Sequence, residues 1–334
     1  MVVKYLQKQP DYVMTKYPML LKAPLKDYIW GGDKLISEYG KETDLNLVAE
    51  SWEVSCHKNG ESIIENGVYK GKTLTSVLNE NSDYKGDNAK KFEKFPLLIK
   101  LIDANDKLSI QVHPDDEFAN DNENGEYGKT EVWYIASAKE NAKLIYGFNR
   151  DIDKNEYKQA ILENRLQEIL NFVPVKKGDV FFIPAGLVHA ICDGILICEI
   201  QQNSDTTYRV YDWGRVGADG KGRPLHIEKA VMVSRLKGEK NTGFSLKQEQ
   251  IGDNKVGTIS ECNYFKAYKY DMNEEIVLNS GLDSFETLTF LSGSGKISMS
   301  AHEEPFKMGQ TYFIPAGSGE YKIKGKCEFI LSKC

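Results

Sequence analysis

The chain has 334 residues, of which 41% are hydrophobic and 28% are charged, a composition typical of globular proteins rather than of disordered or fibrous ones. Its formal net charge of −6 excludes a general basic surface for nucleic acid, and no apolar run approaches the roughly 18 residues of a membrane helix. The opening MVVKYLQKQPDYVMTKYPML carries charges and a proline where a signal peptide needs an unbroken apolar core. We therefore expect a cytoplasmic protein without a nucleic-acid or membrane partner, long enough for two domains.

Most segments between residues 51 and 213 are predicted to be short strands. They are rich in Val, Ile, Tyr, Phe and Trp and are separated by clusters of Gly, Asn, Asp and Pro, which is typical of sandwiches and barrels. The predicted strands lie within residues 51–57, 95–104, 108–113, 131–136, 142–148, 179–185, 194–202 and 207–213.

One segment, residues 151–171, interrupts the strand pattern. Its apolar residues recur close to helical spacing, which predicts one or two amphipathic helices at this position. The residues concerned are Tyr157, Ala160, Ile161, Leu166, Ile169 and Leu170.

A repeat explains the interruption. The stretch GDVFFIPAGLVHAICD begins at Gly178, and GQTYFIPAGSGEYKIK begins 131 positions later at Gly309. Upstream, EVWYI at Glu131 matches TLTFL at Thr287, which is 156 positions later, so the first copy contains about 25 additional residues. This predicts a mainly β protein of two related β-units, with a short helical insert of about 151–171 in the first unit and a linker near residues 234–245.

Four residues of the first unit could hold a metal ion. Gln111 and His113 are two apart in a predicted strand, so their side chains share one face with Ser109. Glu131 opens the next strand, and His189 follows the Pro-Ala-Gly turn. Two imidazoles, a carboxylate and an amide oxygen suit Zn²⁺ or another first-row divalent ion with open positions for substrate. Taken alone, however, the polar row of residues 109–113 is equally typical of any half-exposed strand.

The segment from Gly178 to Asp193 resembles the second signature of the cupin superfamily, G-x5-P-x-G-x2-H-x3-N, with Asp193 in place of the final Asn. The first cupin signature has H-x-H and then Glu, whereas this chain has Gln111-x-His113 and a delayed Glu131. That variation is similar to the type I mannose-6-phosphate isomerases (phosphomannose isomerases) in their short bacterial form. LSIQVHPDD, KTEVWYI, GDVFFIPAGLVHAI and EIQQNSDTTYRVYDWGR occur in the family's order, so the resemblance covers nearly the whole chain.

The resemblance implies two cupin domains of jelly-roll-like β-barrel form. Residues 1–235 would be the catalytic domain with the helical insert, and residues 245–334 a second cupin domain without a metal site. The implied activity is the interconversion of mannose 6-phosphate and fructose 6-phosphate by proton transfer between C1 and C2 through a cis-enediol. The implied cofactor is one zinc ion per chain, another divalent metal being the alternative. The expected partner is the sugar phosphate, and the chain is expected to be a monomer or a homodimer.

The resemblance also assigns roles to single residues. The metal ligands would be Gln111, His113, Glu131 and His189. Arg209 matches the catalytic arginine, and because a guanidinium stays protonated it would stabilise enediolate charge. Glu199 matches the position of the general base, although a structural hydrogen-bonding role, His113, a metal-bound water or a hydride shift between carbons are alternatives.

Five further residues are predicted to contact the substrate. Lys100 is an isolated charge in an apolar run, which indicates a polar cavity or a partner. Lys129 is two residues from Glu131 and would share its face on a continuing strand, although taken alone it is more typical of an exposed lysine. Together with Ser109 they are assigned to the phosphate group, because charge-assisted hydrogen bonds suit a dianion. Trp30 and Glu50 match other pocket positions of the family, and the alternative for Trp30 is a place in the core.

Two other classes of function compete with the isomerase. An Fe(II) oxygenase has nearly the same set of two histidines and a carboxylate, as do other metal-dependent cupin enzymes such as sugar epimerases. Gln111 and the two lysines argue against these. A non-catalytic cupin that binds sugar phosphates is the other alternative, because fold does not determine function. The presence of all four metal positions and of Arg209 argues against it.

Overall fold

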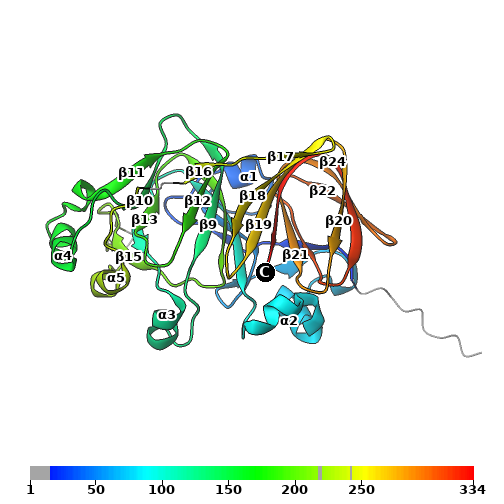
Figure 1. Ribbon diagram of the computed structural model, residues 1–334, viewed down its shortest axis with the longest axis horizontal. Helices are drawn as coiled ribbons and strands as arrows, with labels where there is room; N and C mark the ends of the chain where they lie inside the picture. The colour runs from blue at the N-terminus through cyan, green and yellow to red at the C-terminus, as the bar shows by residue number, and fades with distance from the viewer. Residues whose placement is uncertain (1–15, 217–219, 241–242) are drawn as a thin grey trace, which may run out of the picture.

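The computed structural model describes residues 16–216, 220–240 and 243–334. The strands pair antiparallel in three large sheets and one small hairpin. Figure 1 shows two β-units side by side, one formed by the green strands β9 to β15 and one by the yellow to red strands β18 to β24. The predicted fold class, mainly β with two cupin units, is confirmed.

The first unit consists of a seven-stranded and a five-stranded sheet. The seven-stranded sheet has the order β16-β12-β9-β14-β7-β3-β2, with strands Phe244–Ser245, Asp179–Ile183, Glu131–Ala138, Ile195–Gln202, Leu97–Ala104, Glu50–Val54 and Leu25–Lys26. The five-stranded sheet has the order β11-β10-β13-β8-β15, with strands Leu170–Pro174, Lys143–Phe148, His189–Ile191, Ile110–Val112 and Tyr208–Tyr211.

Alternation along β7 explains why every one of its residues is buried. Ile99 and Leu101 belong to the core that continues into the second unit, whereas Ile102 belongs to the separate core of the first unit. Lys100 shares the inward face with Ile102, because successive side chains of a strand point to opposite sides. The seven-stranded sheet therefore packs against the second unit with one face and lines the interior of the first with the other.

The second unit is one ten-stranded sheet. Eight of its strands come from the C-terminal part of the chain: β17 Glu249–Ile251, β18 Asn254–Glu261, β19 Lys266–Met272, β20 Glu275–Ser280, β21 Glu286–Met299, β22 His302–Lys307, β23 Thr311–Ile314 and β24 Gly319–Lys333. The other two, β1 (Met19–Lys22) and β6 (Ile63–Ile64), come from the N-terminal part, and β1 pairs with β23.

Strand exchange therefore links the two units. While β1 and β6 join the second unit, β16 pairs with β12 in the first. The predicted boundaries at residues 235 and 245 stay a prediction, since both units contain strands from both sides of this division.

The helices lie at the periphery. They are α1 (Lys34–Ser37), α2 (Leu74–Glu80), α3 (Asp116–Asn122), α4 (Lys154–Leu162) and α5 (Ile227–Val233), with 3-10 turns η1 (Gly67–Tyr69), η2 (Ser82–Lys85), η3 (Asp87–Lys91) and η4 (Leu166–Glu168). A small hairpin joins β4 (Cys56–His57) and β5 (Gly60–Glu61). Within the described ranges, every helix is too short or too polar to cross a lipid bilayer.

The helical insert is present where it was predicted. Helix α4 begins after Asp153, whose side chain accepts a hydrogen bond from the backbone N–H of Glu156 and so caps the helix. Its apolar face packs with α5 against the five-stranded sheet. The last two residues of the predicted insert, 170 and 171, already belong to β11.

The repeated turn has the same backbone in both units. Gly178 and Gly309 have φ of 90° and 83°, and Gly186 and Gly317 have φ of 85° and 70°, values that favour glycine. In the first unit the N–H of Gly186 donates to the carbonyl of His113 at 2.8 Å, which ties the turn to a predicted metal ligand. The turn thereby positions His189, which follows three residues later.

Candidate active site and metal centre

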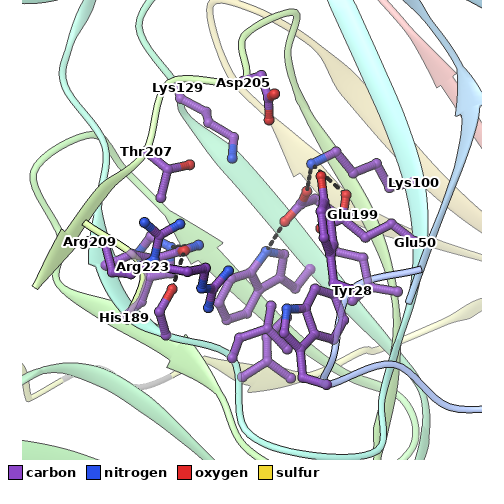
Figure 2. Close-up of a pocket in the computed structure, with 17 residues that line it drawn as sticks. Tyr28, Glu50, Lys100, Lys129, His189, Glu199, Asp205, Thr207, Arg209 and Arg223 are labelled. Atoms are coloured by element: carbon purple, nitrogen blue, oxygen red, sulfur yellow. Dashed lines mark hydrogen bonds and ion pairs between the residues drawn. The ribbon is translucent and has the colours of Figure 1, made fainter. Parts of the chain in front are cut away.

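A cavity of about 360 Å³ opens into the first unit (Figure 2). Both sheets contribute to it, because its residues come from β7, β9 and β14 on one side and from β8, β13 and β15 on the other. The lining residues are Tyr28, Trp30, Glu50, Lys100, Ile102, Leu108, Ser109, Gln111, Lys129, Trp133, His189, Ile191, Glu199, Asp205, Thr207, Arg209 and Arg223.

Three predicted metal ligands lie together next to this cavity, which His189 lines. The candidate ligand atoms of His113, Glu131 and His189 all lie within 4.8 Å of one another, and each residue is only 1% exposed. Nε2 of His113 is 3.2 Å from Oε1 of Glu131, and Nε2 of His189 is 4.0 Å from Oε2. Residues that are far apart in the sequence therefore form one compact polar group.

Backbone carbonyls orient both imidazoles. Nδ1 of His113 donates to the carbonyl of Thr206 at 2.9 Å, and Nδ1 of His189 donates to that of Leu187 at 2.8 Å. Burial, and then the charge of Lys129, lower the pKa of His113 to about 3, and burial also lowers the pKa of His189. Both rings are therefore neutral, with the Nε2 lone pairs directed into the group, as in histidines that bind metals.

The carboxylate of Glu131 supplies a further open ligand atom. Burial raises its pKa, but Lys129 and then His113 outweigh burial and hold the pKa well below its ordinary value. Oε2 accepts a hydrogen bond from Nε1 of Trp133 at 3.0 Å. Oε1 lies 3.0 Å from Nζ of Lys129 but accepts no hydrogen bond of good geometry. A buried carboxylate oxygen in this state is well suited to a metal ion.

Gln111 stands beside this group. It pairs in register with His189, so both side chains lie on the same face of the five-stranded sheet. Nε2 of Gln111 is 3.5 Å from Nε2 of His189, and its Oε1 accepts a hydrogen bond from Ser109 at 3.3 Å. Rotation of the amide by half a turn would exchange these atoms and direct the oxygen to the histidines. The donor set as a whole fits a divalent cation.

Lysines and carboxylates alternate on the side of the seven-stranded sheet. Nζ of Lys100 lies 3.5 Å from Oε2 of Glu50 and 3.4 Å from Oε1 of Glu199. Burial opposes the charge of this lysine, but the two carboxylates raise its pKa above the ordinary value. Burial and then Glu131 raise the pKa of Glu199 to about 7, although Lys100 and Lys129 oppose them. Glu199 also accepts a hydrogen bond from Nε1 of Trp133 at 2.7 Å.

Arginines occupy the other side (Figure 2). Arg209 on β15 pairs in register with Gln111, and its Nη1 donates to the carbonyl of Pro224 at 3.0 Å. Its Nε is buried and has no hydrogen-bond partner in the described part of the chain. Arg223 donates from Nε and Nη2 to the two carboxylate oxygens of Asp212, at 2.8 and 2.7 Å.

Comparison with known proteins identifies the family. The profile of the phosphomannose isomerase type I catalytic domain matches residues 19–129, and that of the mannose-6-phosphate isomerase cupin domain matches residues 255–334. The chain is 40% identical to the mannose-6-phosphate isomerase ManA of Bacillus subtilis over 321 residues, which cover 96% of this chain and 99% of the relative. The chain belongs to the type I phosphomannose isomerase family.

Other relatives agree with this membership. A mannose-6-phosphate isomerase of Streptococcus mutans is 36% identical over 94% of this chain and 98% of its own length. The crystal structure of the Bacillus subtilis mannose 6-phosphate isomerase superposes with a TM-score of 0.87 at 37% identity, covering 94% of this chain and 99% of that one. The Salmonella typhimurium enzyme in its apo form shares the fold, with a TM-score of 0.74 at 17% identity, covering 94% and 98%.

All eleven site residues predicted from the sequence lie in or next to the cavity. Nine of the eleven line the cavity, including Trp30, which lies beside Tyr28 with the ring centroids 5.6 Å apart. The other two, His113 and Glu131, belong to the metal-binding group, whose members lie together. Their proximity supports one shared site, whereas the role of each residue stays a prediction.

Several lining residues were missed by the sequence analysis. Asp205 and Thr207 precede Arg209 at intervals of two, so strand periodicity could have placed them on the same face. Tyr28 is likewise two residues before Trp30. Arg223 has no such signal, because it is 14 residues after Arg209 and reaches the cavity from a loop beyond β15.

Proposed function

We propose that this chain is an isomerase that interconverts mannose 6-phosphate and fructose 6-phosphate. The observation that carries the proposal is the buried group of His113, Glu131 and His189, which lies intact in a chain that matches mannose-6-phosphate isomerases over nearly its full length. We place catalysis in the unit predicted for residues 1–235. In the described part of residues 245–334, no comparable cluster of His, Cys, Asp and Glu occurs.

The proposed metal is one zinc ion per chain, held by Gln111, His113, Glu131 and His189. When bound, it would act as a Lewis acid that stabilises negative charge on the sugar oxygens next to the reacting carbons. The protein contributes ligand orientation, since the Thr206 and Leu187 carbonyls fix the two imidazoles.

Glu199 is the proposed general base. In the forward direction it takes the proton from C2 of open-chain mannose 6-phosphate and returns it to C1, while the hydroxyl proton of O2 passes to O1, so the cis-enediol forms and collapses to the ketose. A pKa of about 7 suits this exchange, because the carboxyl group is then readily found both with and without its proton near neutral pH. The indole N–H of Trp133 and the ammonium of Lys100 position the carboxyl group from two sides.

Arg209 is the proposed stabiliser of the enediolate. Its guanidinium stays charged, and Arg209 is the register partner of Gln111 on the neighbouring strand. Its Nε makes no hydrogen bond to a described residue. Charge stabilisation by a half-buried guanidinium is worth more than in bulk solvent. His113 is less suited to proton transfer, since its Nε2 is directed towards Glu131 and its Nδ1 is committed to Thr206.

The remaining substrate assignments stay predictions. Lys100, Lys129 and Ser109 are the sequence-based candidates for the phosphate, with Trp30 and Glu50 as further contacts. The cytoplasmic location and the monomeric or homodimeric state are also expectations from sequence alone.

A coupled assay tests the proposed function. Purified protein with Zn²⁺ should convert fructose 6-phosphate to mannose 6-phosphate, chelation should abolish the activity, and added Zn²⁺ should restore it. In D₂O, proton transfer through Glu199 should introduce deuterium into the product, whereas a direct hydride shift would not. No turnover by protein with full metal occupancy would contradict the proposal.

A further inference from the structure

The two sides of the cavity differ in their charge balance. On the side of the seven-stranded sheet, the cations Lys100 and Lys129 lie among carboxylates. Asp205 lines the same cavity, and Figure 2 shows it between Lys129 and Lys100. Two cations thus face the three carboxylates of Glu50, Glu131 and Asp205, together with the carboxyl group of Glu199, which carries only part of a negative charge near neutral pH.

The opposite side has an excess of positive charge. Arg215 and Arg223 share one buried carboxylate, that of Asp212, at 2.6 and 2.7 Å. Arg209 forms no ion pair within the described residues, and burial and then repulsion by Arg223 lower its pKa. Two of the three arginines thus share a single buried carboxylate, and the third has no ion pair among the described residues; the exposed Asp106 lies 3.7 Å from Arg215.

A dianion is attracted to the arginine side and repelled by the carboxylates of the lysine side. A divalent cation bound to the histidines and Glu131 would offset the negative excess there. The sugar oxygens would compete with the phosphate for this cation. We propose that Arg223 binds the phosphate group of the substrate at the arginine side of the cavity. The inference rests on the proposed function only in taking a sugar phosphate as the ligand. It is an alternative to the sequence-based assignment of the phosphate group to Lys100, Lys129 and Ser109.

The geometry supports this role. Asp212 holds Arg223 through Nε and Nη2, while Nη1 makes no hydrogen bond to a described residue, so the guanidinium is oriented and still has a donor available. Figure 2 shows Arg223 and Arg209 together at the side of the cavity away from Lys100 and Glu50. A planar guanidinium held in this way matches the oxygens of a phosphate.

The order of strands fits a hexose phosphate lying across the cavity. His189, Gln111 and Arg209 are register partners on the adjacent strands β13, β8 and β15. The segment that follows Arg223 lies beside Arg209, because the N–H of His226 donates to the carbonyl of Arg209 at 2.8 Å and Arg209 donates to the carbonyl of Pro224. The reacting carbons would lie between the metal-binding group and Arg209, and the phosphate at the far end of the sugar would reach Arg223.

Binding of inorganic phosphate tests the inference without turnover. In calorimetric titrations of the metal-loaded protein, Arg223→Met should weaken phosphate binding about 10- to 100-fold, and Arg223→Lys should recover part of the loss. Arg223→Met should also raise the KM for fructose 6-phosphate by a similar factor, with kcat changed less than about threefold. The variant should fold, because Asp212 keeps its ion pair with Arg215.

Arg215→Met is the matched control. It removes one charge from the same cluster, but Arg215 does not line the cavity, so phosphate affinity should change by less than about threefold. Arg223→Met with unchanged phosphate affinity, or no phosphate binding by the wild-type protein, would overturn the inference. Loss of affinity in Lys129→Met but not in Arg223→Met would assign the phosphate to the lysine side. Phosphate binding through Arg223 without any isomerase activity would contradict the proposed function alone.

Discussion

The two units contain the same turn but differ at the residue that the turn presents. In the first unit, His189 is buried and directed towards His113 and Glu131, whereas the corresponding Glu320 of the second unit is exposed on β24. Glu131 likewise corresponds to Thr287. Because the glycines of both turns have nearly equal φ angles, the shared residues determine the backbone. The residues that are not shared determine the chemistry.

The interiors differ in the same sense. Aromatic rings fill the second unit, where Phe290 and Phe306 stack with centroids 3.8 Å apart. Its buried carboxylate, Glu286, accepts a hydrogen bond from the Tyr321 hydroxyl at 2.7 Å and lies 3.4 Å from Nζ of Lys333. By contrast, Glu131 and Glu199 of the first unit each have a buried oxygen without a hydrogen bond. Buried carboxylate oxygens without a hydrogen bond thus distinguish the unit that is proposed to bind metal and substrate.

The largest expected effect comes from replacing by alanine the residue that follows the repeated turn in each unit, His189 or Glu320. His189→Ala should reduce kcat/KM for fructose 6-phosphate by at least about 10³-fold, because it removes a ligand of the proposed metal. Glu320→Ala should leave the rate within about twofold of the wild type, as its side chain is exposed and outside the cavity. Equal losses in the coupled assay would show that the units do not differ as described.

Stability should show the reverse pattern. Phe290→Ala should lower the free energy of unfolding by about 3–5 kcal/mol, because it opens a cavity among stacked rings. His189→Ala should cost only about 1–2 kcal/mol in protein without metal. Urea unfolding of the two variants measures both values. A larger loss of stability for His189→Ala than for Phe290→Ala would contradict the expected importance of aromatic packing in the second unit.

The smallest expected effect concerns one buried carboxyl group in each unit. The folded-state pKa of Glu199, about 7, lies above the ordinary value of 4.5, so between these pH values the folded protein binds more protons than the unfolded one. Its contribution to the free energy of unfolding is therefore largest at low pH and falls as the pH rises towards 7. We therefore compare the free energy of unfolding of metal-free Glu199→Gln with that of the wild type at two pH values. The difference should move in favour of the variant by about 1–3 kcal/mol between pH 5 and pH 8.

Glu286→Gln is the comparison for this measurement. Burial also raises the pKa of Glu286, although Tyr321 and Lys333 oppose this effect. The contribution of Glu286 to the free energy of unfolding should therefore also fall as the pH rises. The turnover of Glu286→Gln should stay at the wild-type level, whereas Glu199→Gln should lose most of its activity. Parallel stability curves for wild type and Glu199→Gln would contradict the raised pKa.

Local patterns predicted the metal-binding group well. The Gln-x-His spacing, the start of a strand at Glu131 and the repeated turn before His189 are each short-range signals, and together with the family resemblance they led to one site. Lys100 was recognisable for a similar reason, since a charge in a buried strand needs a polar environment.

Longer-range features could not be predicted in this way. The pairing of β1 with β23 depends on contacts between residues almost 300 positions apart, for which no periodicity gives a signal. Arg223 reaches the cavity from a loop, and its orientation depends on Asp212, whose role becomes visible only in the folded chain. The charge imbalance across the cavity likewise depends on which side chains meet in space.

Metal stoichiometry tests the central claim most directly. Equilibrium titration of the metal-free chain with Zn²⁺, followed by elemental analysis after gel filtration, should give one tightly bound ion per chain in the wild type and in Glu320→Ala. His189→Ala should retain substantially less than one. Two tightly bound ions in the wild type, none, or full occupancy in His189→Ala would contradict a single metal centre in the first unit.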